Sequence, residues 1–150
     1  MKVDYFTIPE ITVSYKDNVR ISERATVKTT EDAAKILSVA FEGCMEHHEE
    51  AYVLFLNKAR RVLGISCISK GGISGTAMDI RIILQAALKS SASCLLVSHN
   101  HPSGSLTPSS EDMAVTKSLQ RGCEAVGIHM DDHIVMTSEG YMSFADEGLL

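Results

Sequence analysis

The sequence predicts one α/β domain built on a mixed sheet flanked by helices. Its 150 residues are 45% hydrophobic and 22% charged, the balance of an ordinary globular domain with a substantial core. Amphipathic helical patterns alternate along the chain with runs of β-forming residues, as in α/β proteins. One short apolar run, residues 94–97, leads straight into a polar loop, and open α/β sheets bind their ligands at such strand ends.

In the first half of the chain, a helix is predicted over residues 31–45, because its apolar residues keep helical spacing and Thr30 is a good N-cap. β-Branched and aromatic residues predict a strand over 52–56 and a second over 61–68, joined by a turn into a hairpin. The glycine-rich loop that follows, residues 70–77, is too irregular for a nucleotide-binding motif, and we consider it as a border of a substrate groove.

In the second half, an amphipathic helix is predicted over residues 79–89, a buried strand over 94–97 and another helix over 110–126. Two further strands are predicted around 134–136 and 141–144. Helices that lie between strands in this way favour a mixed sheet with a polar site at the end of its interior strand.

Residues 1–20 are predicted to be an N-terminal extension or an edge strand, with 11–15 as the strand, ahead of a domain over 21–150. Neither a signal peptide nor about 18 consecutive apolar residues is found, so we expect no membrane association and a cytoplasmic protein. The cysteines are widely spaced beside apolar runs, which predicts buried free thiols in a reducing compartment. They are Cys44, Cys67, Cys94 and Cys123.

The clearest chemical signal is the stretch 98–112, SHNHPSGSLTPSSED. His99 and His101 are two residues apart in extended chain and therefore share one side of it. Asp112 follows across a reversing loop, so the three side chains predict a metal site, and three protein ligands leave a fourth zinc position open for water. Ser109 and Asp112 also fit a capping box for the next helix, which is compatible with a ligand role because a helix start is a rigid mount.

Zinc held by two histidines and an aspartate lowers the pKa of a bound water toward about 7, but hydrolysis also needs a base. Glu49 or Glu50 can serve if the strand that they open lies beside strand 94–97. Alternation puts the two glutamates on opposite faces, so only one should matter. The competing interpretation is a solvated acidic turn, and the preceding His47 and His48 are expected to be exposed.

These residues resemble a known family. An upstream glutamate followed by H-x-H-x7-S-x2-D matches the JAMM motif of JAB/MPN metalloproteases. The phrases VLFLN, SHNHPSG, TPSSED, DDHIVM and SFADEG resemble the RadC-like JAB domain of bacteria, over residues 21–148. The resemblance implies a mixed curved sheet flanked by helices, the cytidine-deaminase-like architecture of JAB/MPN proteins.

The resemblance also implies roles by position. Ser109 would donate a hydrogen bond to the oxyanion of a tetrahedral intermediate. Family spacing, with the glutamate four residues before VLFL, favours Glu49 as the general acid/base and leaves Glu50 as the alternative. One Zn²⁺ per chain is implied, with the ligands His99, His101 and Asp112.

We therefore expect a zinc-dependent metallopeptidase that cleaves peptide or isopeptide bonds in a protein or peptide substrate through a zinc-activated water. Two alternatives stay open: a DNA-repair-associated accessory protein or nuclease of the RadC type, and a zinc-bound adaptor without turnover. The net charge of −5 disfavours nucleic acid, and the chain is too short for the DNA-associated helix-hairpin-helix region of longer RadC proteins. Asn100 stands where isopeptidases usually carry Ser or Thr, so eukaryote-like substrates do not follow.

The stretch HMDDH, residues 129–133, adds one further candidate. His133 could brace the metal ligands through a hydrogen bond from behind. A second metal site within HMDDH is the weaker interpretation, because alternating polar residues that enter a strand need no metal ion.

Overall fold

The computed structural model describes residues 5–72, 75 and 77–150, and it contains a five-stranded mixed sheet in the order β2-β1-β3-β4-β5. The strands are β1 (Glu50–Leu56), β2 (Val62–Lys70), β3 (Cys94–Asn100), β4 (His129–Met136) and β5 (Tyr141–Ser143). The helices are α1 (Thr30–Phe41), α2 (Ile80–Lys89) and α3 (Ser110–Ala125), with 3₁₀ helices at Tyr5–Thr7 and Ile21–Glu23. The predicted α/β class with a mixed sheet flanked by helices is confirmed.

The central strand of the sheet is β3, which is buried along its whole length. β1 forms the predicted hairpin with β2 and runs antiparallel to β3, with Ala51 opposite His99. On its other side β3 runs parallel to β4, and β5 pairs antiparallel with β4. The condition set for the two glutamates, that their strand lies beside β3, is therefore met.

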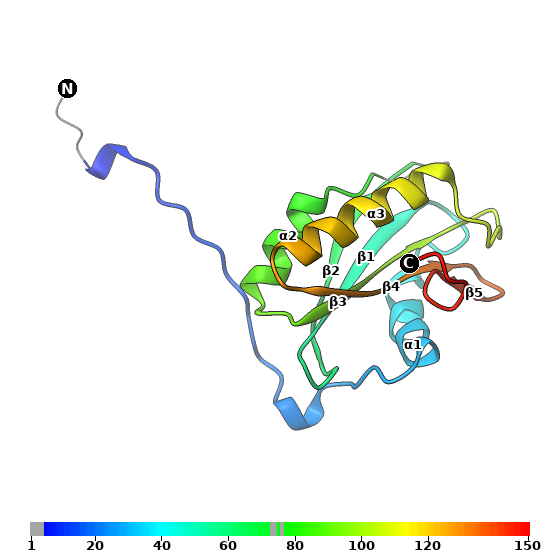
Figure 1. The fold of residues 1–150 in the computed structure, drawn as a ribbon, viewed down its shortest axis with the longest axis horizontal. Coiled ribbons are helices and arrows are strands. Elements are labelled where there is room, and N and C mark those ends of the chain that lie inside the picture. The colour runs from blue at the N-terminus through cyan, green and yellow to red at the C-terminus, as the bar shows by residue number, and fades with distance from the viewer. Residues whose placement is uncertain (1–4, 73–74, 76) are drawn as a thin grey trace.

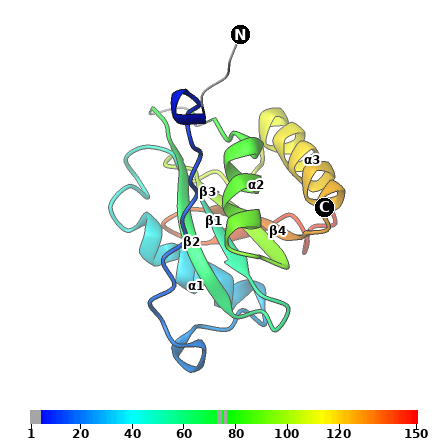
Figure 2. The ribbon, with the colours of Figure 1, turned by 90° about the vertical axis from the view of Figure 1, so that its left-hand side faces the viewer.

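Helices cover both faces of the sheet, with α1 on one face and α2 and α3 on the other (Figures 1 and 2). Side chains of β1 alternate between the two cores, as a strand requires. Leu54 and Leu56 pack in the core beneath α1, whereas Val53 and Phe55 pack in the core beneath α2 and α3. The alternation predicted for this strand is confirmed.

The helix predicted over 31–45 corresponds to α1, which begins at Thr30 and already ends at Phe41. Thr29 rather than Thr30 is the N-cap, because its hydroxyl accepts the Asp32 N–H while the Asp32 carboxylate accepts the Thr29 N–H. After Phe41 the chain leaves the helix in a series of turns. These turns carry the carbonyl groups of Cys44 and Met45 to a buried side chain of β3, described below, instead of along a helix axis.

Other boundaries differ in informative ways. β4 begins at His129 instead of 134, because a register shift makes Asp131 an extra residue between Met130 and Asp132 and the strand continues past it.

The strand predicted over 11–15 is wrong: the segment is extended but unpaired, and Ile11 is 87% exposed. Its last residue, Tyr15, still contacts the edge of the sheet, because its hydroxyl donates to the Leu63 carbonyl of β2, and the chain before it extends away from the domain (Figure 1).

Three further expectations concern exposure. Cys44, Cys94 and Cys123 are buried free thiols as predicted, but Cys67 is exposed, because it lies on the edge strand β2. The loop predicted over 70–77 includes residues 73, 74 and 76, which lie outside the described residues. In the described part of the chain, no helix is long and apolar enough to cross a bilayer.

The α1 core gives a test of the packing. Leu37 is fully buried on α1, whereas Val39 on the same helix is 70% exposed. Leu37→Ala should lower the free energy of unfolding by about 2–5 kcal/mol, because it removes buried methyl groups and leaves a cavity. Val39→Ala should change it by less than about 0.5 kcal/mol. Urea denaturation followed by circular dichroism measures both, and equal effects would contradict the packing of α1.

Candidate metal centre

The side chains of His99, His101 and Asp112 converge on one point. The two imidazole Nε2 atoms lie 2.9 Å apart, and the Asp112 carboxylate oxygens lie 3.2 Å from His99 Nε2 and 3.5 Å from His101 Nε2. Nitrogen and oxygen ligands of a tetrahedral zinc ion, each about 2.0–2.1 Å from the metal, lie roughly 3.3 Å from one another. The two contacts of Asp112 match this spacing, and the two Nε2 atoms lie somewhat closer together than a bound ion would hold them.

Two elements bring these donors together. His99 lies near the carboxyl end of β3 and His101 directly follows that strand, so both imidazoles face the side of the sheet covered by α3. Asp112 lies in the first turn of α3, where the predicted capping box is present. Its Oδ2 atom accepts the Ser109 N–H at 2.7 Å, and Ser109 Oγ accepts the Asp112 N–H at 3.0 Å. The cap holds the carboxylate in the orientation that meets the histidines.

A chain of hydrogen bonds behind the site determines which ring nitrogens carry hydrogen. Thr116 Oγ1 lies 2.6 Å from the Asp112 carbonyl, which can only accept, so the hydroxyl hydrogen goes there. Thr116 Oγ1 must then accept from His133 Nδ1 at 2.6 Å, which leaves the His133 Nε2 lone pair to accept from His99 Nδ1 at 2.8 Å. His99 Nε2 is consequently a lone pair, and it points into the site.

His101 reaches the same state by a different contact. Its Nδ1 atom lies 2.7 Å from the Ser105 carbonyl and donates to it, so its Nε2 lone pair faces His99 Nε2. Two lone pairs and a carboxylate at these distances repel one another unless a positive charge lies among them. The donor set therefore fits a metal ion.

The pKa shifts agree with this demand for positive charge. Burial alone would raise the pKa of Asp112, but the interactions of its carboxylate with His101 and His99 outweigh burial and hold that pKa far below its usual range. The hydrogen bond to Asp112 raises the pKa of His101 despite burial, and the charge of Glu49 adds to the same effect. Without a metal ion, a proton on an imidazole supplies the missing charge.

His133 lies behind the three ligands and hydrogen-bonds to His99. This is the supporting position for which the sequence made it a candidate. It is fully buried, and burial lowers its pKa to about 3, so the ring is neutral. Its ring stacks on that of Phe144, with centroids 4.5 Å apart and planes 12° from parallel. Sequence reasoning assigned no role to Thr116 or Phe144. The spacing of four residues between Asp112 and Thr116, about one helical turn, could have indicated that Thr116 lies on the same side of the helix as the ligand.

Glu49, which precedes β1, and Glu50, which opens it, are directed to opposite faces of the sheet. Continuing the register from Ala51 and His99 sets Glu49 opposite His101, on the α3 face, and Glu49 is half-buried there. Glu50 is only 5% exposed on the α1 face, where it accepts from the Tyr52 hydroxyl at 2.6 Å. The interpretation of both as a solvated turn is thus wrong for Glu50.

The exposure expected for the preceding histidines is half right. His47 is exposed, but His48 is half-buried, because its Nε2 atom lies 2.8 Å from Glu50 Oε1. The HMDDH stretch does not gather as a cluster of metal-ligand spacing in the described residues. Asp131 instead pairs with Arg60, and His129 is largely exposed.

Asn100, between the two histidines, points to the opposite face and holds the segment before β1. Its Oδ1 accepts the Glu50 N–H at 2.8 Å. Its Nδ2 lies 3.2, 3.1 and 2.9 Å from the carbonyl oxygens of Cys44, Met45 and His48. The amide is fully buried, so no water replaces these partners. Asn100 therefore fixes the segment from which Glu49 extends.

Comparison with known proteins agrees with this geometry. The RadC-like JAB domain model matches residues 27–149. A UPF0758 protein of Flavobacterium johnsoniae is 42% identical over 102 residues, which cover 68% of this chain and 44% of that protein. A UPF0758 protein of Coprothermobacter proteolyticus is 37% identical over 130 residues, 85% of this chain and 55% of that protein. The chain spans about half the length of the curated relatives it matches.

The mixed sheet flanked by helices, with a candidate metal centre at the end of β3, is the JAB/MPN fold of a metallohydrolase-like domain. Within that class, the chain belongs to the RadC-like JAB domain family.

The hydrogen-bond chain behind His99 predicts an effect of Thr116 on the metal centre. Thr116→Val keeps the shape of the side chain but leaves His133 Nδ1 without its acceptor, so the tautomer of His99 is no longer fixed. The affinity for Zn²⁺ should fall by about 10–100-fold. Competition with a chromophoric chelator measures it, with Thr30→Val on α1 as the control. Unchanged affinity in Thr116→Val would contradict the assigned tautomers.

The role of Asn100 predicts a selective loss of stability. Asn100→Asp keeps the acceptor oxygen but removes the N–H donors, so three carbonyl groups lose their partner, and stability should fall by about 2–3 kcal/mol. Asn57→Asp is the matched control, because Asn57 accepts from Ala59 and Arg61 N–H groups through its oxygen, as a carboxylate also can. Urea denaturation compares the two, and faster amide exchange at 44–50 should accompany Asn100→Asp alone.

Proposed function

We propose that the chain is a zinc-dependent hydrolase of the JAMM type that cleaves peptide or isopeptide bonds in a protein or peptide. The proposal is supported above all by one observation, the convergence of two imidazole lone pairs and a carboxylate on the face that also carries Glu49. This arrangement joins a three-ligand metal centre to a second carboxylate within the same site. Hydrolysis of an amide needs both.

His99, His101 and Asp112 would hold the zinc ion, which when bound supplies a Lewis acid and lowers the pKa of water toward about 7. Glu49 would take a proton from the attacking water and return it to the leaving nitrogen as the C–N bond breaks. Its position opposite His101 and its partial burial suit that transfer. Glu50 is directed to the other face and is engaged by Tyr52 and His48 there.

Ser109 would stabilise the oxyanion that forms when water adds to the amide carbonyl. Its Oγ accepts the Asp112 N–H as the helix cap, and a hydroxyl that accepts one bond can still donate its own hydrogen. Ser109 is exposed at the start of α3, next in the capping box to a proposed ligand. A substrate carbonyl at the metal centre can therefore reach it.

Removal of the base without removal of the metal tests this function. Glu49→Gln should lower the cleavage rate by about 10²–10⁴-fold, because the amide cannot take the proton, while bound zinc stays unchanged. New amino termini in a proteome-derived peptide library, counted by mass spectrometry, report cleavage. Glu46→Gln, an exposed glutamate of the same segment, is the matched control.

Full activity of Glu49→Gln would overturn the assigned base. Glu50→Gln completes the comparison, since loss of turnover in that variant together with an active Glu49→Gln would transfer the role to the other face of the sheet. Elemental analysis of each variant separates a chemical defect from loss of the metal ion.

A further inference from the structure

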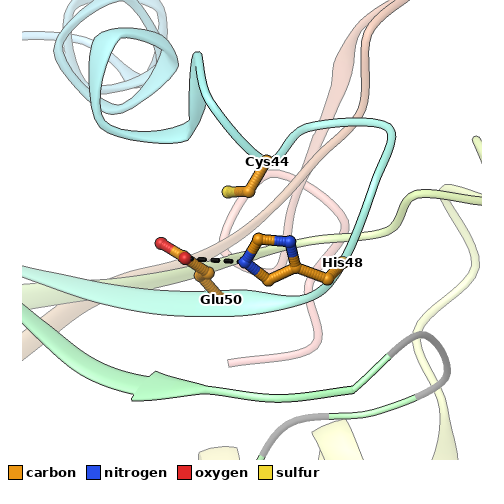
Figure 3. Close-up of side chains that lie close together, drawn as sticks. All are labelled: Cys44, His48 and Glu50. Carbon is orange, nitrogen blue, oxygen red and sulfur yellow. Dashed lines mark hydrogen bonds and ion pairs between the residues drawn. The ribbon is translucent and has the colours of Figure 1, made fainter.

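A second group of metal-binding side chains lies on the α1 face of the sheet, behind the first site. Cys44 comes from the turns after α1, His48 lies two residues before Glu50, and Glu50 opens β1. One ligand atom from each lies within 4.8 Å of the other two. Figure 3 shows the thiol, the imidazole and the carboxylate directed toward one another. We propose that these three side chains form a second metal site that binds a zinc-class transition ion.

The donor set selects the class of ion. A thiolate, an imidazole and a carboxylate together suit Zn²⁺ or Co²⁺, whereas Mg²⁺ and Ca²⁺ prefer oxygen ligands alone. His48 Nε2 and Glu50 Oε1 are 2.8 Å apart, somewhat closer than the roughly 3.3 Å expected around a tetrahedral zinc ion. An ion between them would therefore require the His48 ring, whose Nδ1 lies 2.9 Å from His47 Nδ1, to move away from Glu50.

The surroundings prepare these side chains for a ligand role. The Tyr52 hydroxyl donates to Glu50 Oε2, which orients the carboxylate and leaves Oε1 directed at His48. Asn100 binds the carbonyl groups of Cys44 and His48 and the N–H of Glu50, so the backbone of all three ligands is fixed by one buried amide. Such supporting hydrogen bonds orient ligands in metal sites.

Two features of this group oppose metal binding, a nearby lysine ammonium and the high pKa of the cysteine thiol. A bound metal ion can displace both the ammonium and the thiol proton. Lys70 Nζ lies 3.5 Å from Glu50 Oε1, but its side chain is 69% exposed and can turn into solvent. Burial raises the pKa of the Cys44 thiol to about 11, so the metal displaces a proton from the sulfur when it binds. One Cys44 S–H bond breaks, one metal–sulfur bond forms, and the proton leaves to solvent.

Cobalt tests this site separately from the first. The first site contains no sulfur, so a thiolate-to-cobalt charge-transfer band in the near ultraviolet cannot come from it. Titration of the full chain with Co²⁺ should develop that band to about one equivalent at this site, and excess Zn²⁺ should remove it. Absence of the band at saturating Co²⁺ would overturn the proposal.

Variants assign the band to its ligands. Cys44→Ala should abolish it, whereas Cys123→Ala, which removes another buried thiol from the opposite core, should leave it intact. His48→Ala retains the thiol and should shift the titration to higher Co²⁺. Persistence of the band in Cys44→Ala, or an unshifted titration in His48→Ala, would contradict the assignment.

His99→Ala keeps the outcome independent of the proposed hydrolase. That variant disables the first site on the α3 face and should retain the charge-transfer band. Loss of the band in His99→Ala would show that cobalt binding at Cys44 depends on the first site and would overturn an independent second site.

Discussion

The two-residue period of β3 is the constraint on which the rest of the molecule depends. Because neighbouring side chains of a strand point to opposite faces, His99 and Asn100 cannot share a side of the sheet. The histidine faces α3 and the candidate metal centre, and the asparagine faces α1 and the turns before β1. Two adjacent residues of one buried strand therefore serve both faces of the sheet. His99 belongs to the ligand set on the α3 face, and Asn100 binds the backbone of the segment before β1 on the α1 face.

Buried polar groups at this strand end are satisfied by one another rather than by solvent. The chain from the Asp112 carbonyl through Thr116 and His133 to His99 leaves each hydrogen-bonding atom along it with a partner. Such a closed network is costly to break, because an unpaired group in a core keeps its full desolvation penalty. The ring of His99 therefore has one orientation and one tautomer before any ligand arrives.

Much of this arrangement could be predicted from sequence, because it follows from periodicity and short-range spacing. The hairpin, the start of α3, the capping box at Ser109 and the opposite faces of Glu49 and Glu50 all depend on residues within a few positions of one another. The alignment of His133 with Val97 could not be predicted, since it depends on a bulge at Asp131 that no local pattern specifies. The group at Cys44 likewise appears only once Asn100 folds the turns back onto β1.

Asp112 combines two tasks in one carboxylate. The same Oδ2 atom that faces His101 accepts the Ser109 N–H at the start of α3. A cation bound at this site would therefore draw on a carboxylate that already orders the first turn of α3. Occupancy of the site and the stability of this helix end would then be coupled, so backbone spectroscopy of the first turn of α3 would report the addition or removal of an ion.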